Sequence, residues 1–351
     1  MKRVLFILKR KENFNAEVDK HIGVTTGLYN SASFMDNMLK DAGIKSNMEI
    51  AIDNNCIDRL VTKHRPTHVI IEALWVVPSK FAVLNPLHKD VTWIIRVHSE
   101  MPFLAGEGMA MDWLGEYSNY KNIIIGVNAP RMLSELKFYL QHKHGWTNEE
   151  ADRRVVYMPN YYPTAYEQKT YDISEKEYVD IGCFGAVRPL KNHMLQAIAS
   201  IKFADQIGKK LRFHINSGRL EMKGEPVLNN LRGLFTHLYE QGHEIVSHSW
   251  THRDEFLKLC AQMDIGMQVS FSETFNIVGA DFVSQAVPFV GSNEIPWSSN
   301  MFNADPASSD DIFHKLMLAH NNPQKNIEQQ QGLLTKYVTN TQDIWVKYFG
   351  E

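Results

Sequence analysis

Short apolar runs alternate with amphipathic segments along the first 130 residues of the chain. Runs such as "RVLFILK" and "TWIIRVH" lack the polar–apolar alternation of a strand with one face in water, so we expect strands that are buried on both faces. Strands that alternate with helices through short links predict a parallel, doubly wound sheet. The predicted strands are residues 3–9, 47–52, 67–74, 92–98 and 122–128; the predicted helices are 30–43, capped by Asn30 or Ser31, and 56–64, with a helical turn region at 78–88.

A second alternation of strands and helices follows a segment rich in Pro, Tyr and charged residues, from Met158 to Val179. We therefore expect two α/β domains, an acceptor-side domain at 1–160 and a second domain at 179–330. A linker at 161–178 would join them, and a C-terminal helix at 331–351 would pack back on the first domain. In the second half the predicted strands are 179–185, 211–217, 243–248, 264–270 and 288–292, and the predicted helices are 192–208, 227–242, 252–263 and 275–286, with one or two more within 326–349.

The composition is that of a folded globular protein, with 44% hydrophobic and 22% charged residues in 351. The formal net charge of -3 argues against a protein that binds nucleic acid over its whole surface. Three widely separated cysteines favour a reducing compartment over a disulfide framework or a cysteine zinc site. Because no apolar run approaches the roughly 18 residues of a membrane span, we expect a cytoplasmic protein without a signal peptide.

Two acids, Glu273 and Asp281, stand eight positions apart in "SFSETFNIVGADFVSQAVPFVGS". We expect a helix to begin at Phe275, where its first-turn N–H groups would form an anion site. Eight residues are a little over two helical turns, so Asp281 would project to nearly the same side as the helix start. One acid would then reach a sugar and the other a ribose diol. The alternative is that Glu273 caps the helix and Asp281 is a surface acid.

Two cations, Arg188 and Lys191, fall in the loop after the first strand of the second domain, in "DIGCFGAVRPLKNHMLQAIA". Ligands of doubly wound sheets bind at the carboxyl ends of the strands. Arginine and lysine at that edge suit a diphosphate, through charge-assisted hydrogen bonds. The alternative is a solvated surface pair.

Together, "GAVRPLKN" and "SETFNIVGAD" resemble the donor-binding half of the retaining GT-B glycosyltransferases. The resemblance extends over residues 180–292. It implies a GT-B fold, with two doubly wound Rossmann-like domains facing across a cleft. It also implies that a sugar moves, with retention of configuration, from a nucleotide diphosphate sugar to an acceptor hydroxyl. UDP is the nucleotide we expect, and we expect neither a metal nor a cofactor besides the donor.

The resemblance also implies a set of donor contacts. Two positions depart from the family pattern: Asp281 replaces the usual Glu, and Asn276 replaces the usual Gly. The implied contacts are Arg188 and Lys191 with the diphosphate, Glu273 with hydroxyls of the transferred sugar, the backbone at Phe275, Asn276, Ile277 and Val278 with phosphate, Asp281 with the ribose, and Ser249, in the loop 247–250, near the base.

The first domain supplies further candidates by the same resemblance. Gly27, in "HIGVTTGLYNSASF", would approach the donor, although the stretch also suits an ordinary loop and helix cap. His98 ends the strand 92–98, where family members contact the donor sugar, although a histidine in this place can be purely structural. Ser99 and Glu100 follow it on the acceptor side. Together, the residues expected to be catalytic are His98, Arg188, Lys191 and Glu273; Glu72, which ends another strand, is a weaker candidate.

Several motifs of other enzyme classes are absent from the sequence. There is no D-x-D metal-nucleotide pair, no G-x-G-x-x-G after the first strand and no G-x-x-x-x-G-K-[ST]. These absences argue against a metal-dependent glycosyltransferase of the other main fold, a dinucleotide enzyme and an ATPase. His243, His248 and His252 lie close in sequence, but we interpret them as ordinary residues rather than as metal ligands.

The acceptor is open at this stage. "GLYNSASFMDNML" and "RVHSEMPFLAGEGMAMDWL" resemble phage-encoded glycosyltransferases, which can modify hydroxymethylated pyrimidines in DNA. Such a protein would act in the host cytoplasm, on a base flipped out of the duplex. A surface glycan, a lipid-linked acceptor, a small molecule and a non-catalytic sugar-nucleotide or glycan-binding protein are the alternatives. The basic residues that would meet a DNA backbone are Lys9, Arg10 and Lys11, with Arg59, Lys63, His64 and Arg65 as a second cluster.

Overall fold

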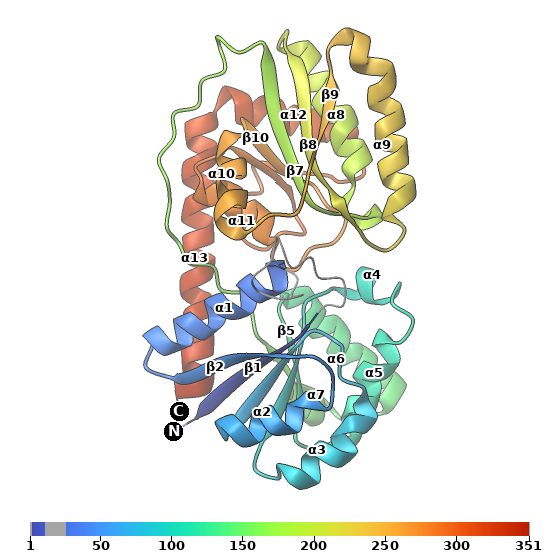
Figure 1. Ribbon diagram of the computed structural model, residues 1–351, viewed down its shortest axis with the longest axis vertical. Helices are drawn as coiled ribbons and strands as arrows, with labels where there is room; N and C mark the ends of the chain where they lie inside the picture. The colour runs from blue at the N-terminus through green and yellow to red at the C-terminus, as the bar shows by residue number, and fades with distance from the viewer. Residues whose placement is uncertain (1, 11–25, 351) are drawn as a thin grey trace. The chain divides into compact units, whose positions relative to one another are not determined.

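A computed structural model describes residues 2–10 and 26–350 of the chain. The chain forms two compact units. Unit 1 comprises Met1–Pro163 and Val338–Glu351, and unit 2 comprises Thr164–Tyr337. Figure 1 shows the helices and strands of both units along the chain.

The described part of unit 1 has one parallel sheet of six strands, in the order β2-β1-β3-β4-β5-β6. Its strands are β1 (Arg3–Lys9), β2 (Lys45–Ala51), β3 (His68–Glu72), β4 (Thr92–Val97), β5 (Ile123–Val127) and β6 (Val155–Tyr157). Its helices are α1 (Thr26–Asp41), α2 (Cys56–His64), α3 (Phe81–Leu87), α4 (Met101–Leu104), α5 (Ala110–Glu116), α6 (Pro130–His144), α7 (Asn148–Arg154) and the end of α13 (Pro323–Gly350), with 3-10 turns at Pro78–Lys80 and Tyr117–Asn119.

The apolar run of β1 is buried on both faces of this sheet. Leu5 and Ile7 pack in a core cluster with residues of α2 and α3. Phe6 and its same-face neighbours pack in another cluster with α1 and with Trp345 of α13. Alternate side chains of one strand therefore enter two different cores, which explains the continuous apolar sequence and confirms the expectation of two buried faces.

The end of α13 is part of the core of unit 1. Trp345 is only 1% exposed, and its indole Nε1 donates to the carbonyl of Pro159 at 2.9 Å. The guanidinium of Arg96 lies 5.2 Å from the centre of the Trp345 ring, a cation–π contact. The last turns of the helix thus complete the hydrophobic packing of a sheet whose strands come from the other end of the chain.

Unit 2 is a second parallel sheet of six strands among the residues described, in the order β12-β11-β10-β7-β8-β9. Its strands are β7 (Tyr178–Val187), β8 (Lys210–Leu220), β9 (Glu244–His248), β10 (Ile265–Gln268), β11 (Phe289–Ser292) and β12 (Asn303–Ala304). Its helices are α8 (His193–Gln206), α9 (Gly224–Leu238), α10 (Arg253–Gln262), α11 (Ile277–Ser284), α12 (Ser309–Asn321) and the first part of α13, with 3-10 turns at Pro189–Lys191 and Tyr239–Gln241.

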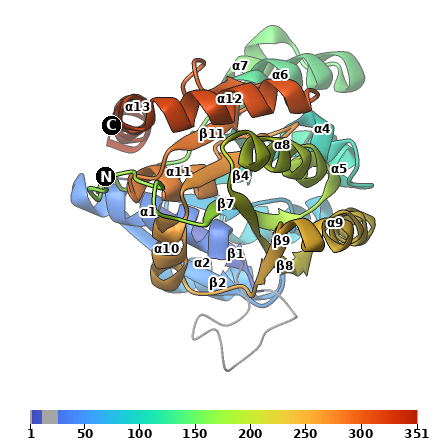
Figure 2. The ribbon, with the colours of Figure 1, turned by 90° about the horizontal axis from the view of Figure 1, so that it is seen from above.

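Helices cover both faces of the sheet of unit 2. α8, α9 and α12 share one core cluster with β7 and β8, and α8 and α12 lie side by side (Figure 2). On the other face, the ring of Phe282 in α11 lies so close to Gly182 and Gly266 that a Cβ at either glycine would overlap it. Strands of both sheets are thus enclosed between helices, as in a doubly wound fold.

The strand order reverses next to the first strand of each unit. In unit 2 the chain runs from β7 to β8 and β9 on one side, and then returns to place β10 on the other side of β7. In unit 1 the same reversal lies between β1 and β3. Ligands of such sheets bind at the carboxyl ends of the strands beside the reversal, so the loops after β7 and β10 are the place to look for a site in unit 2.

The segment predicted as a linker has no helix or strand between residues 161 and 177, but it packs against the units. Tyr162 is buried in unit 1. In unit 2, the backbone N–H of Glu167 donates to the carbonyl of Ser284, Lys169 donates to that of Met263, and Ile173 enters the core. The polar composition of the segment is therefore that of a chain packed along the surface of the units, and not that of an unpacked linker.

The structure corrects several expected elements. The first helix begins at Thr26, before the predicted caps Asn30 and Ser31, because Leu28 and Tyr29 pack against the core of unit 1. α13 is a single helix. The elements that were not predicted from the sequence are β6, β12, α4, α5, α6, α7 and α12. No helix in the described ranges is both long and apolar enough to cross a membrane.

We predict that Trp345→Ala lowers the free energy of unfolding by about 3–5 kcal/mol, because it leaves a cavity beside Phe6 and removes a buried hydrogen bond. The matched control is Phe138→Ala, since Phe138 is 62% exposed on α6 and should cost less than about 1 kcal/mol. Urea denaturation measures both. Equal losses for the two variants would contradict the placement of Trp345 in the core.

Candidate functional site

A buried ion pair joins the loops after β7 and β10 at the reversal of strand order in unit 2. Lys191 ends the 3-10 turn after β7, and Glu273 follows β10. The Nζ of Lys191 donates to the Oε1 of Glu273 at 2.5 Å, and the two side chains are only 12% and 8% exposed. Two residues predicted separately from their motifs thus meet at the edge where such sheets bind ligands.

Gln268, the last residue of β10, holds this pair in place. Its amide Nε2 donates to the carbonyl of Phe184 on β7 at 2.8 Å. Its Oε1 accepts from the Nζ of Lys191 at 3.3 Å and from the Nδ2 of Asn276 at 3.0 Å. Gln268 was not among the predicted residues, although a polar residue at the end of the apolar run "DIGMQ" was a signal that could have revealed it.

Asn276 sets the start of α11. Its φ of 64° lies in the left-handed region, where glycine is unstrained and asparagine is among the best-tolerated other residues. Its Oδ1 also accepts from the backbone N–H of Gly279 at 2.8 Å, which caps the helix. Asn276 therefore adopts a backbone conformation that glycine favours and adds a side-chain cap.

The helix begins at Ile277, two residues later than predicted. Phe275 lies before it and is buried, and its carbonyl accepts from the indole Nε1 of Trp297 at 2.6 Å. Ile277 and Val278 occupy the first helical positions, where backbone N–H groups have no partner within the helix. These two N–H groups, rather than those of Phe275 and Asn276, are the first-turn donors.

Arg188 is paired with an acid in the same loop region. Its Nη1 lies 3.2 Å from the Oε2 of Glu221, which also pairs with Arg219. The start of α9 comes unusually close to this loop: a Cβ at Gly224 would lie 2.0 Å from the carbonyl oxygen of Val187. Only glycine fits there.

Asp281 is buried in the second turn of α11, at 3% exposure. Its Oδ1 lies 2.6 Å from the Nη1 of Arg253, the first residue of α10. The predicted ribose-binding acid is therefore held in an ion pair between two helices. Arg253 was not predicted from the sequence.

Asn216 of β8 links the loop of Ser249 to β7. Its Oδ1 accepts from the backbone N–H of Gly185 at 3.0 Å, and its Nδ2 donates to the carbonyl of Ser249 at 3.4 Å. Gly185 has a φ of 108°, which side chains rarely allow, so this irregularity within β7 requires glycine. Ser249 thus lies in the loop directly after β9, at the same edge of the sheet as Lys191.

The three histidines considered as metal ligands have other partners. His243 bonds Asp205 at 3.1 Å, and His248 bonds His214 at 2.9 Å. His252 is the N-cap residue of α10. Over residues 2–10 and 26–350, no three His, Cys, Asp or Glu side chains are grouped as a metal site would require.

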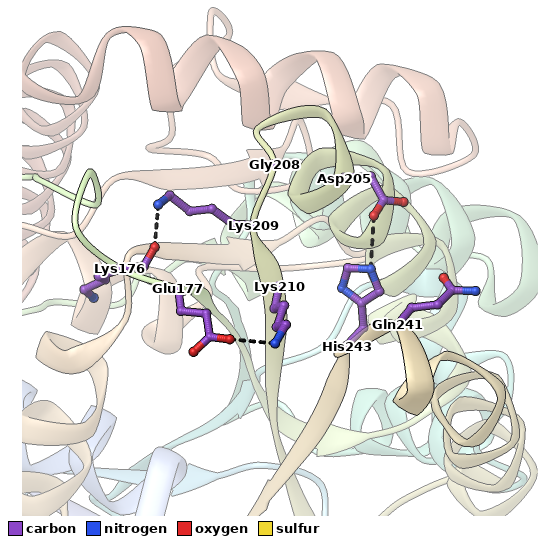
Figure 3. Close-up of a pocket in the computed structure, with 8 residues that line it drawn as sticks. All are labelled: Lys176, Glu177, Asp205, Gly208, Lys209, Lys210, Gln241 and His243. Atoms are coloured by element: carbon purple, nitrogen blue, oxygen red, sulfur yellow. Dashed lines mark hydrogen bonds and ion pairs between the residues drawn. The ribbon is translucent and has the colours of Figure 1, made fainter.

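A pocket of about 360 Å³ lies at the amino ends of β8 and β9 (Figure 3). In it, Lys210 pairs with Glu177 at 2.6 Å, and Asp205 points at the ring of His243. Lys191 and Glu273 follow the carboxyl ends of their strands, at the opposite edge of the sheet. Because the charged side chains in this pocket are already engaged by one another, by Asp264 or by backbone carbonyls, we assign it no ligand.

In unit 1, a buried charge network orients His98. The ring Nε2 of His98 bonds the carboxylate of Glu72, which is fully buried at the end of β3. Arg96, on the neighbouring strand, donates to the same carboxylate at 3.1 Å. Burial alone would raise the pKa of Glu72, but Arg96 and His98 outweigh it and hold that pKa below its ordinary value. An ionised Glu72 therefore fixes the ring of His98.

The other candidates of unit 1 lie at three places. Ser99 and Glu100 follow His98, and Glu100 is buried in an ion pair with Arg131 of α6. Gly27 lies in the first turn of α1. Lys9 and Arg10 lie at the carboxyl end of β1, and Lys11 falls outside the described residues.

The second basic cluster does not join the first. Lys63 and His64 both bond Glu49 at 2.6 Å. The carbonyl of Arg65 accepts from Arg3, at the amino end of β1. Lys9 is at the other end of this seven-residue strand, a span of about 20 Å. Arg65 and Lys9, one from each basic cluster, therefore lie at opposite ends of β1.

No protein-family model matches the chain, and no curated protein sequence does. Solved structures do resemble it over nearly its whole length. A UDP-forming α,α-trehalose-phosphate synthase from Burkholderia xenovorans is 11% identical, with 99% of this chain and 98% of that one covered and a TM-score of 0.67. The Anabaena protein HepE, in complex with UDP and glucose, is 12% identical, with full coverage of both chains and a TM-score of 0.65. The catalytic domain of starch synthase IV from Arabidopsis thaliana, bound to ADP and acarbose, is 8% identical, with full coverage of both and a TM-score of 0.68.

The chain has the GT-B fold. Identities near 10% show the fold alone. They confirm the predicted α/β class, with its two parallel, doubly wound sheets.

Within this fold, we predict that Asn276→Ala is less stable than Asn276→Gly by about 1–2 kcal/mol. Both variants lose the cap and the bond to Gln268, but only alanine keeps a Cβ in the left-handed conformation. Thermal or urea denaturation of the two variants measures the difference. A glycine variant that is as unstable as the alanine variant would contradict the argument from backbone conformation.

A pH dependence follows from His193, next to the loop of Lys191. Burial, together with the charges of Lys191 and Arg188, lowers the pKa of His193 to about 3. Between about pH 6.5 and 3 the unfolded chain therefore binds a proton that the folded chain does not, so stability falls as the pH falls through this range. Replacing the ring removes this contribution.

We predict that His193→Met is less sensitive to acid than the wild type. When the pH is lowered from 7.5 to 5, the unfolding free energy of the wild type should fall by about 2 kcal/mol more than that of the variant. Urea denaturation at the two pH values checks this. If the difference between the two proteins is the same at both pH values, His193 titrates normally and the prediction is wrong.

Proposed function

We propose that the protein is a glycosyltransferase that moves a sugar from a nucleoside diphosphate sugar to an acceptor hydroxyl, with retention of configuration. The observation that carries the proposal is the buried pair of Lys191 and Glu273, at the reversal of strand order and beside the first turn of α11. UDP is the nucleotide we propose. Structures of this fold that are described as UDP-forming or as bound to UDP support that choice.

Lys191 stabilises the leaving diphosphate in this proposal. An ammonium group has three N–H donors; here two point to Glu273 and Gln268, which leaves one for a phosphate oxygen. Arg188 and the N–H groups of Ile277 and Val278 add further positive potential. Donors that are fixed before the reaction stabilise the charge that develops in the transition state, and this is commonly the largest catalytic effect. The reaction so proposed uses no metal and no cofactor besides the donor.

The carboxylates bind the sugar parts of the donor. Lys191 engages Oε1 of Glu273, and Oε2 accepts hydroxyl groups of the transferred sugar. Asp281 binds the ribose, and Ser249 lies near the base. For His98 we propose a contact with the transferred sugar, with Glu72 as the positioning residue that fixes the ring. The leaving phosphate takes the acceptor proton during attack on the same face.

The acceptor that we propose is a hydroxymethylated pyrimidine in DNA. Lys9 and Arg10 support it, because they lie at the carboxyl end of β1, beside the strand reversal of unit 1, and could neutralise phosphates. Ser99 and Glu100 are further candidates for the acceptor. A surface glycan or a lipid-linked hydroxyl, and a protein that binds sugar nucleotides without turnover, are the outcomes against which this is tested.

The test is release of nucleoside diphosphate from UDP-, GDP- and ADP-sugars, with and without DNA that contains 5-hydroxymethylcytosine. Mass spectrometry of the nucleosides follows. Release stimulated by this DNA, with a sugar-sized mass gain on the base, supports donor and acceptor together. Slow release that ignores DNA supports the transferase and moves the acceptor to a glycan or lipid. Binding of a sugar nucleotide without release from any donor overturns the enzymatic function.

We predict that Lys191→Ala and Glu273→Ala each lower turnover by about 10²–10³-fold, as expected when a preorganised charge is removed. Lys202→Ala is the matched control, because Lys202 makes an exposed ion pair with Asp310 on the same unit and should leave turnover unchanged. Initial rates of nucleotide release measure all three variants, and circular dichroism checks their folding. Folded Lys191 and Glu273 variants with wild-type rates would contradict the assignment.

A further inference from the structure

The first residue of α10 carries a positive charge in an unfavourable place. The N-terminus of a helix bears a partial positive charge, so a cation in the first turn is disfavoured, whereas the acids Asp254 and Glu255 that follow Arg253 are favoured. The helix dipole therefore does not explain an arginine at the first position of α10. Its Nη1 makes an ion pair of 2.6 Å with Asp281.

The pair is buried unequally. The side chain of Asp281 is 4% exposed, and that of Arg253 is 19% exposed. Asp281 faces α10, because its Oδ1 pairs with Arg253 on that helix. The partly open end of the pair is thus the guanidinium, and the carboxylate lies beneath it. A ligand that approaches this place meets Arg253 as well as Asp281.

We propose that Arg253 is a ribose-contacting, specificity-determining residue, and that Asp281 positions it. The inference rests on the proposed function, in which a nucleoside diphosphate binds to unit 2. A lone carboxylate accepts both hydroxyls of a ribose through its two oxygens. Here Oδ1 is engaged by Arg253, so Asp281 accepts one ribose hydroxyl and Arg253 donates to the oxygen of the other.

The chemistry of the two groups allows this division. A guanidinium has five N–H donors in a planar fork, so it can hold Asp281 and also donate to a ligand oxygen. A carboxylate has about four acceptor positions. The shorter Asp281 also fits, since the reach that a glutamate would supply is supplied by the arginine. The departure from the family pattern and the unpredicted ion pair are then two parts of one receptor for the ribose.

The alternative is a structural bridge between α10 and α11, and the experiment separates the two. Calorimetry on the full chain measures binding of UDP and ADP and of their 2′-deoxy and 3′-deoxy analogues. The variants are Arg253→Lys, which can keep the ion pair but not the fork, and Asp281→Asn. Arg212→Lys is the matched control, because Arg212 forms an arginine–carboxylate pair with Glu244 at 2.9 Å elsewhere in unit 2.

The proposal expects the wild type to bind its nucleotide about ten-fold or more tightly than either deoxy analogue, since buried polar groups penalise a ligand that lacks its hydroxyl. Arg253→Lys should weaken binding of the parent nucleotide about ten-fold. In this variant, the loss of affinity caused by removing one ribose hydroxyl should shrink to about two-fold, whereas the loss for the other hydroxyl should persist. The melting temperature should not change. Asp281→Asn should shrink both penalties, and Arg212→Lys neither.

Two results would overturn the inference. If the wild type binds a nucleotide but Arg253→Lys retains both penalties, Arg253 is only a bridge between helices, and the proposed function stands. A lower melting temperature with unchanged nucleotide discrimination leads to the same conclusion. If the wild type binds neither UDP nor ADP nor any analogue, the proposed function fails, and the inference fails with it.

Discussion

The buried ion pair between Lys191 and Glu273 is the interaction on which the candidate site depends. Charges that are removed from water are costly unless each has a partner and further hydrogen bonds. Lys191 and Glu273 neutralise each other, and Gln268 adds a hydrogen bond to the lysine. Loss of either charge leaves the other buried and uncompensated. The pair therefore ties the loops after β7 and β10 into one arrangement.

The surrounding backbone is shaped to keep that arrangement. Gln268 is fixed to β7 by its bond to Phe184, and it also receives the side chain of Asn276. Asn276 in turn adopts the left-handed conformation from which α11 begins. A diphosphate that binds between Lys191 and the start of α11 would thus meet groups already held by the sheet. Such preorganisation is what electrostatic catalysis needs.

Much of the fold could be predicted from the sequence, because strands enclosed by helices must be apolar throughout. That reasoning located β1, β3, β4 and β5 and their counterparts in unit 2. It failed for β6 and β12, which have three and two residues and too little sequence to show a pattern. It also missed α6 and α12, although Pro130 in the first turn of α6 and Ser308 before Asp310 and Asp311 of α12 are helix-start signals in the sequence.

The site could be predicted only in part, for similar reasons. Lys191 was singled out because it follows an apolar strand, and Glu273 because it precedes an expected helix start; the structure brings the two together in an ion pair. Gln268 and Arg253 were missed because their importance lies in contacts between residues far apart in sequence. Asn276 stands out in the sequence as a departure from the resembled pattern, but its left-handed backbone is known only from the structure.

The most direct test of the central claim is a crystal structure of the chain with bound UDP. The account predicts that the diphosphate lies against the Nζ of Lys191 and the backbone N–H groups of Ile277 and Val278. It also predicts that Glu273 remains beside the lysine and faces the position of the transferred sugar. A nucleotide bound elsewhere on the chain, with the pair of Lys191 and Glu273 untouched by it, would contradict the account.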